Sequence, residues 1–145
     1  MKIEYRTPAG TGTYSVLTDS DTPAATLDRI SAYKPGLHAS PMTEPLAVSA
    51  GQAFASFITG RSGQWNVSFA VDRQHASADA ALLFLQVHPT IFAKAAQFDL
   101  KITVGAQVVY LPSCAPTLID PDEHSDLHTF TRYSFVGGNY TTTAP

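Results

Sequence analysis

The clearest pattern in the chain is an alternation of large apolar residues with smaller or polar ones from Gln64 to Asp72. A period of two residues is typical of a β-strand that buries one face and leaves the other in water. The side chains of the apolar face are aromatic or β-branched, which suits a pleated surface; they are Trp65, Val67, Phe69 and Val71. This segment is therefore predicted to be a half-buried strand.

The period changes directly afterwards, and residues 77–88 are predicted to form a helix. The segment is rich in alanine and leucine, which have high helix propensity. Ser77 is a natural N-cap, and Pro89 disfavours a helical conformation for the residue before it. Only three polar residues follow the cap, so we expect most sides of the helix to be covered; they are Asp79, Gln86 and His88. The segment is far too short to span a bilayer.

Alternation returns in residues 98–104 and 107–111, which are predicted to be two strands of a hairpin. Gly105 and Ala106 between them fit a two-residue type II′ turn with glycine first. The chain from Gln64 to Tyr110 therefore reads strand, helix, strand, turn, strand. Further strands are predicted elsewhere from shorter patterns; they cover residues 2–6, 13–17, 51–59 and 129–136. Residues 60–63 are predicted to be a turn.

Three segments give weaker signals. Residues 23–30, after a capping Thr22, fit a short helix, while an extended segment over 26–33 fits equally. Residues 37–50 contain Pro41 and Pro45 and show little periodicity, so they are predicted to be either a surface connection or an arm that docks on a neighbouring subunit. Beyond Pro112 we expect an extended segment to residue 119 and then an acidic loop over 120–126.

Together these elements predict a mainly β, α+β fold. We expect about seven strands in two packed sheets, as a β-sandwich or barrel-like domain, with one principal helix at 77–88. The 145 residues suggest one domain. Residues 1–50 would supply N-terminal strands and an extended arm of that domain, 51–140 the β-rich core with its helix, and 141–145 a flexible tail.

Composition excludes several classes of function. Only 14% of the residues are charged, the net charge is −3 and no basic run is present, so a phosphate-neutralising nucleic-acid surface is not expected. No membrane association is expected either, and the first residues lack the apolar core of a cleaved secretion signal. Cys114 is the single cysteine, so an intrachain disulfide is impossible.

The most suggestive chemical cluster lies between residues 120 and 128, where Asp122, His124 and His128 are candidate metal ligands. The two histidines would share one face of a helix, but Pro121 and the following strand argue against a helix here. A solvated loop is the simpler interpretation, so no metal is expected. A small metal-dependent enzyme built on these three residues is kept as the weakest functional alternative.

No other residues form a catalytic or cofactor-binding constellation, and no cofactor is expected. His75 and Ser77 resemble a base and a nucleophile, but no Gly-x-Ser-x-Gly turn surrounds Ser77, and helix capping explains it better. Cys114 has no cationic neighbour in sequence that would activate its thiol. The loop Gly10-Thr11-Gly12 lacks the lysine and the following helix of a phosphate-binding loop.

Residues 52–140 resemble small structural proteins of bacteriophage and prophage tails. The matching motifs consist of core and turn residues; they are Trp65-x-Val67-x-Phe69-x-Val71-x-Arg73-x-His75, Ala80-Ala81-Leu82-Leu83-Phe84-Leu85 with His88-Pro89, Leu100-x-Ile102-Thr103, and Tyr133-x-Phe135-Val136-Gly137-Gly138. The resemblance implies a β-sandwich or barrel with one flanking helix, assembly into rings or tubes, and no active site. It also implies copies of itself and other tail proteins as partners, and a place in the virion after assembly in the host cytoplasm.

A ligand-binding β-sandwich module, for carbohydrate in particular, is the alternative function. Such a module needs exposed aromatic side chains gathered on one surface. The candidates in this chain are Tyr5, Tyr14, Tyr33 and Tyr140.

Overall fold

The computed structural model describes residues 1–46, 55–93 and 97–145, and it describes side chains in these ranges except at 38–46, 55–63 and 121–123. The elements, in chain order, are β1 (Lys2–Arg6), β2 (Ser15–Asp19), β3 (Leu27–Leu46), β4 (Ala55–Gln74), α1 (Ala78–Val87), α2 (Thr90–Ala93), β5 (Phe98–Val104), β6 (Gln107–Ser125) and β7 (His128–Gly137). Neither of these helices is long and apolar enough to cross a membrane.

All seven strands belong to one antiparallel sheet with the order β2-β1-β5-β6-β7-β4-β3. The prediction of a mainly β fold with one principal helix is confirmed. The prediction of two packed sheets or a barrel is wrong: within the described ranges there is no second sheet, and the sheet stays open because β2 and β3 are its two edges.

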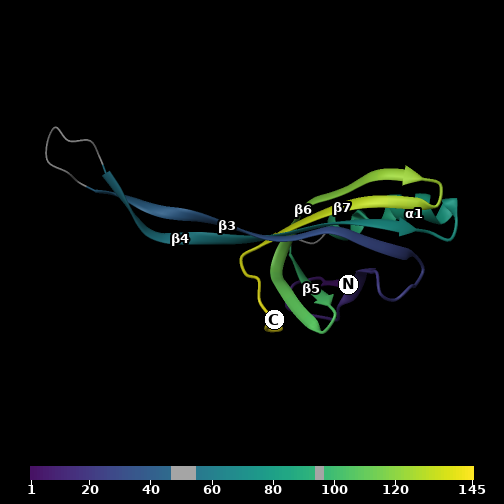
Figure 1. Ribbon diagram of the computed structural model, residues 1–145, viewed down its shortest axis with the longest axis horizontal. Coiled ribbons are helices and arrows are strands. Elements are labelled where there is room, and N and C mark those ends of the chain that lie inside the picture. Colours follow the sequence, from purple (N-terminus) through teal and green to yellow (C-terminus); the bar gives the residue numbers. More distant parts are fainter. Residues whose placement is uncertain (47–54, 94–96) are drawn as a thin grey trace.

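The reason is the long strand β6, which pairs with two different neighbours in succession. Its first part, up to Cys114, pairs with β5, and its second part, from Ala115, pairs with β7. Between them the backbone turns at Ser113, whose φ of +50° lies in the left-handed region. Figure 1 shows β6 curving through this bend from the β5 side of the body to the β7 side. A sandwich-like core thus forms inside one sheet that folds over itself.

The core fills the inside of this fold and draws residues from both halves of the sheet. Phe92 of α2 packs between the two halves of the sheet. Its ring centroid lies 5.4 Å from that of Phe98 on β5 and 5.8 Å from that of Phe135 on β7. The buried apolar cluster comprises Ile3, Leu17, Val67, Phe69, Val71, Phe92, Phe98, Leu100, Ile102, Leu111, Cys114, Tyr133 and Phe135.

Helix α1 begins where the sequence predicted. The Ser77 hydroxyl accepts a hydrogen bond from the Ala80 N–H at 3.1 Å, and the helix ends at Val87 with His88 as its C-cap. The prediction that most of the helix is covered is wrong. Three large side chains on its outer face are more than half exposed, although the sequence contains few polar residues there; they are Leu82, Leu83 and Val87.

Strands β3 and β4 are each 20 residues long and form one antiparallel hairpin. Strand β4 pairs with β7 only from Trp65 to Gln74, so within the described part of the chain residues 38–46 and 55–64 pair only with each other. We call these two segments the ribbon. Figure 1 shows the ribbon projecting far from the body of the protein, at the end opposite α1.

The structure resolves the segments that gave weak sequence signals. The extended alternative after Thr26 is confirmed, since β3 begins at Leu27, and the predicted turn at 60–63 is wrong because β4 runs through it. The predicted strand at 13–17 is observed as β2, two residues later, while residues 51–54 lie outside the described ranges. The predicted acidic loop at 120–126 is also wrong, because β6 continues to Ser125 and turns into β7 through residues 126–127.

Candidate functional site

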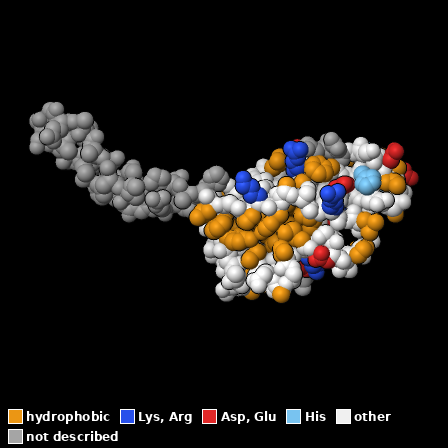
Figure 2. All heavy atoms as spheres, viewed as in Figure 1, with side chains coloured by type: hydrophobic (Ala, Val, Ile, Leu, Met, Phe, Trp, Pro, Cys, Tyr) orange, Lys and Arg blue, Asp and Glu red, His pale blue; other side chains and the backbone are white. Residues whose placement is uncertain are grey.

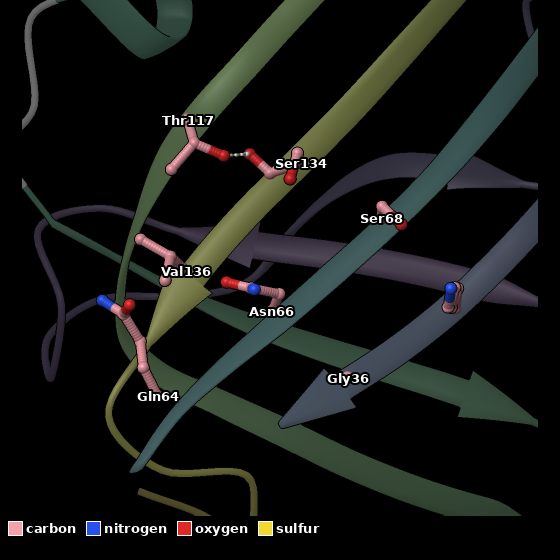
Figure 3. Close-up of a pocket in the computed structure, with 8 residues that line it drawn as sticks. Gly36, Gln64, Asn66, Ser68, Thr117, Ser134 and Val136 are labelled. Carbon is pink, nitrogen blue, oxygen red and sulfur yellow. Dashed lines mark hydrogen bonds between the residues drawn. The ribbon is translucent and has the colours of Figure 1, made fainter. Parts of the chain in front are cut away.

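A groove of about 580 Å³ lies on the outer face of the sheet, where β3, β4, β7 and β6 run side by side (Figure 3). It follows from the alternation in β4, because the residues between the buried ones point outwards. The lining residues are Lys34, Gly36, Gln64, Asn66, Ser68, Thr117, Ser134 and Val136. Within the groove, the Thr117 hydroxyl donates a hydrogen bond to the carbonyl oxygen of Ser134 at 3.2 Å.

The chemistry of this groove is hydrogen bonding. Its polar groups are amides and hydroxyls, and Lys34 is the charged residue among its described lining. Amides and hydroxyls do not act as general acids or bases at neutral pH, and that lining contains no carboxylate, imidazole or thiol that could do so or bind a metal. The groove therefore offers hydrogen-bonding amides and hydroxyls and the ammonium group of Lys34.

The predicted metal candidates are only partly brought together. His124 lies on β6 and His128 on β7, at the two sides of the β6–β7 turn. The Nδ1 atom of His128 lies 3.2 Å from Oδ1 of Asp72 on β4, and both side chains are about half exposed. The side chain of Asp122 lies outside the described residues. Among the side chains that are described, no three histidine, cysteine, aspartate or glutamate residues cluster as metal ligands, so the metal hypothesis stays a prediction.

His75 and Ser77 each have a separate structural partner. His75 is buried and its Nε2 lies 2.8 Å from the Thr129 hydroxyl on β7, while Ser77 caps α1. Burial, reinforced by the nearby positive charge of Arg73, lowers the pKa of His75 below its ordinary value. Cys114 is fully buried, and burial raises the pKa of its thiol to about 12, so the thiolate is not formed at neutral pH.

The four tyrosines proposed as a ligand platform do not share a surface. Tyr33 and Tyr140 join their hydroxyls at 2.7 Å, and the Tyr140 ring stacks on Trp65 with centroids 5.0 Å apart. Tyr5 instead packs on Phe92 in the core, whereas Tyr14 lies near Tyr110 and beneath the guanidinium of Arg6. Tyr33 and Tyr140 thus hold the C-terminal segment against the base of the ribbon, where β3 and β4 leave the body; we call this place the root of the ribbon.

Arg73 and Asp99 are among the buried charged residues that the sequence analysis missed. Arg73 is 2% exposed and Asp99 is 1% exposed. A signal for Arg73 exists, because it continues the alternation of Trp65 to Val71 and so falls on the buried face of β4. Asp99 gives no such signal, since it faces away from Phe98 and Leu100 in the same strand and is covered by the loop around Gly10 and by the β6 bend.

Comparison with known proteins places the fold in a class. No family model and no curated protein matches the sequence. The solved structures with a similar fold are components of phage-type tails and baseplates.

One of these is a chain in the tail of an empty GTA particle with C6 symmetry: the TM-score is 0.55 at 14% identity, over 99% of this chain and 95% of that one. Another is a chain of the phage p2 baseplate in its activated conformation with Sr: the TM-score is 0.58 at 13% identity, over 92% of this chain and 43% of that one. The same baseplate with Ca gives equal values. This protein thus spans less than half of the baseplate chain that it matches. The resemblance to tail-associated structural proteins is confirmed at the level of the fold.

Proposed function

We propose that this protein is a non-enzymatic structural component of a phage-type tail, and that copies of it assemble with one another through the ribbon. The observation that carries the proposal is the ribbon itself, 38–46 paired with 55–64 and with no third strand among the described residues. A two-stranded hairpin alone is at best marginally stable in water. Its open edges offer unpaired N–H and C=O groups that another chain can complete.

The similarity to the GTA tail chain supports the same proposal, because it extends over nearly the whole length of both chains and that tail has C6 symmetry. A projection at one end of a subunit makes contacts between different surfaces of neighbouring copies, and such contacts close into rings when the rotation permits. We propose a ring or tube of copies, with other tail proteins as further partners and the virion as its final location.

Side-chain contacts at the root of the ribbon fix the direction of the ribbon relative to the body of the protein. The Tyr33–Tyr140 hydrogen bond and the stacking of Tyr140 on Trp65 connect β3, the start of the β4–β7 pairing and the C-terminal segment. Just beyond this cluster, Leu37 leaves 53% of its surface exposed. An apolar side chain at the point where the ribbon leaves the body is suited to burial against a second copy.

The test is to replace residues 38–64 by a two-residue Asn-Gly turn that joins Leu37 of β3 to its partner Trp65 of β4. We expect the truncated protein to keep the circular dichroism and urea midpoint of a folded domain, while rings or tubes disappear from light scattering and negative-stain images. Wild-type-like assembly of the truncated protein would refute the role of the ribbon. A full-length protein that stays monomeric at every concentration, with and without other tail proteins, would refute the tail function itself.

A point substitution refines the test. Leu37→Asp places a charge at the root of the ribbon and is expected to weaken assembly at least tenfold. Leu127→Asp is the matched control, because Leu127 is also exposed, at 37%, but lies in the β6–β7 turn. Equal effects of the two substitutions would show that exposed apolar surface in general, and not this position, drives association.

A further inference from the structure

The ribbon has two long edges, and they differ in what they offer to another chain. One edge belongs to β3 and the other to β4, since residues 38–46 and 55–64 pair with each other. In an antiparallel ladder the backbone N–H and C=O groups of successive residues point alternately to the two sides of the strand. Each edge can therefore be assessed by the groups that it turns outwards at every second residue.

The edge of β3 is poor in hydrogen-bond donors. Pro35, Pro41 and Pro45 are separated by even numbers of residues, and the register shift between Met42 and Thr43 inserts its extra residue in β4, so the three proline nitrogens point to the same side of β3. On the side of β4 each proline would remove a ladder hydrogen bond, whereas on the free side the missing N–H costs no pairing. The proline nitrogens therefore lie along the free edge of β3.

A bulge weakens the same edge where β3 runs along the body. The pairing of β3 with β4 shifts between Ser31 and Lys34, and Ala32 has a φ of +54°, in the left-handed region. Bulges and prolines interrupt the regular spacing of edge groups, and natural sheets use both to prevent the addition of further strands. The free edge of β3 is thus protected along the body as well as along the ribbon.

The edge of β4 has no such protection along the ribbon. Strand β4 contains no proline, and β7 covers its edge only as far as Gly137, which lies opposite Trp65. Beyond Gly137 the C-terminal segment turns away from the ribbon (Figure 1), and its Thr141 pairs with Tyr110 of β6. Residues 55–64 therefore have an edge that no described strand completes, in the line in which β7 would continue.

The pairing register indicates which amides of β4 face this edge. Residues directly opposite each other in an antiparallel pair are either bonded to each other or both turned away. Pro41, whose nitrogen faces outwards, lies opposite Arg61, so the N–H of Arg61 also points away from the partner strand. Gly63 has the same orientation and lies opposite Ala39 in regular pairing. A glycine inside a strand often marks the close approach of another backbone, which fits a strand added here.

We propose that a strand of a second copy of this chain adds to the ribbon along residues 55–64 of β4, in the line of β7, and that the proline-containing edge of β3 stays free. This inference rests on the proposed assembly and specifies which edge of the ribbon takes part in it. A second copy is the occupant because every subunit of the proposed ring or tube carries the same incomplete edge and has a neighbouring copy that can complete it.

The experiment compares substitutions on the two edges of the full-length protein. Arg61→Pro removes an outward N–H from the β4 edge, Arg61→Ala removes only the side chain, and Ala39→Pro removes an outward N–H from the β3 edge. None of the three removes a hydrogen bond between the two strands, so the urea midpoint of the body should stay unchanged. We expect Arg61→Pro to raise the concentration at which light scattering detects assembly about tenfold or more, because a hydrogen bond is lost and the proline ring obstructs the added strand. The two controls should assemble like the wild type.

Amide hydrogen exchange of the wild type gives a direct second measurement. We expect the amides of Arg61 and Gly63 to exchange about tenfold or more slowly in the assembly than in the monomer, and the amide of Ala39 to exchange equally fast in both. Protection of Ala39 with free exchange at Arg61 would move the added strand to β3 and overturn the inference. Protection of Arg61 that appears only after another tail protein is added would overturn the assignment of a second copy.

The outcomes separate this inference from the proposed function. If the deletion of the ribbon abolishes assembly but Arg61→Pro assembles like the wild type, the added strand is refuted and the tail function stands. Equal weakening by Arg61→Pro and Arg61→Ala would assign the contact to the side chain and also refute the added strand. A wild-type protein that never assembles, alone or with other tail proteins, would refute the function itself.

Discussion

Replacing Asp99 by asparagine tests whether one buried carboxylate holds the bend of β6 and the N-terminal loop in place. The carboxylate accepts hydrogen bonds from Nε of Arg6 at 2.7 Å, from the N–H of Gly10 at 2.7 Å and from the N–H of Ser113 at 2.8 Å. Ser113 is the residue with positive φ at the bend, so Asp99 joins β1, the loop after β1 and the two halves of the sheet.

The expected loss of stability follows from the interactions that asparagine cannot make in place of the carboxylate. An amide has the size of the carboxylate but offers one acceptor oxygen, and its NH₂ group faces at least one donor. The guanidinium of Arg6, whose side chain is 11% exposed, also loses its counter-charge. Breaking one partner of a buried ion pair costs about 3–5 kcal/mol, and an unpaired buried N–H about 1–3 kcal/mol. Because these contributions overlap, we expect the free energy of unfolding to fall by roughly 3–5 kcal/mol.

The pH dependence gives an independent check. Burial alone would raise the pKa of Asp99, but the hydrogen bonds from Gly10, Ser113 and Arg6 outweigh it, and the pKa is lowered. A carboxyl with a lower pKa in the folded state stabilises the protein above its unfolded pKa of about 3.9. This contribution is lost as the pH falls through the folded value. The variant should therefore lose less stability than the wild type when the pH is lowered below about 4.

The assay is urea unfolding followed by circular dichroism at pH 7 and at several values below pH 4. Asp126→Asn is the control, because Asp126 is exposed in the β6–β7 turn with φ of +43°, a conformation that asparagine also tolerates. We expect this control to change stability by less than about 0.5 kcal/mol. A loss below about 1 kcal/mol for Asp99→Asn, together with an unchanged acid profile, would refute the role given to this carboxylate.

Three further predictions concern packing and burial. Gly137→Ala should lower the free energy of unfolding by about 1–3 kcal/mol, because an added Cβ would lie 2.9 Å from Cδ1 of Leu111; Gly138→Ala, where the same atom meets nothing within 4 Å, is the control in the same urea assay. Cys114 should react with a thiol reagent at neutral pH only after unfolding, given its burial and its pKa of about 12, and rapid labelling of the native protein would contradict this. Burial lowers the pKa of His88 to about 3 in the folded protein, whereas the unfolded chain takes up this proton near pH 6.5. The free energy of unfolding should therefore decline as the pH falls from about 6.5 towards 3. The His88→Gln variant should show a flatter profile of urea midpoint against pH over that interval.

Local patterns predicted the elements whose burial is periodic. The alternation around Val67 and the cap at Ser77 correctly located part of β4 and the start of α1, because a buried face and a capping hydroxyl are decided by neighbouring residues. Periodicity does not report how strands are joined into a sheet. The two sets of strands thus suggested two sheets, whereas one strand, β6, belongs to both.

Proline misled the sequence analysis at β3 and β6 for a physical reason. Proline interrupts a strand only where its missing N–H is needed. Strand β3 is an edge strand, so Pro41 and Pro45 can lie in it. Each part of β6 pairs with one strand alone, apart from a single bridge between Tyr110 and Thr141. Pro112 lies in the irregular pairing between β5 and β6, and Pro116 and Pro121 each lie at a register shift against β7. Arg73 contacts Leu17 of β2 and Asp28 of β3, and no local sequence pattern encodes the approach of these two strands.

The exposed outer face of α1 has a consequence for how copies of the protein can be arranged. Figure 2 shows apolar side chains gathered over much of the visible surface of the body, with the charged ones scattered around them. Leu82, Leu83 and Val87 add to the apolar surface at the end of the molecule away from the ribbon. A monomer in water therefore has an unfavourable feature at each end: a two-stranded hairpin that is marginally stable alone, and an apolar helix face exposed to water. In the ring or tube proposed above, contacts with neighbouring copies would relieve both costs, in every subunit of a closed ring and in all but the terminal subunits of a tube.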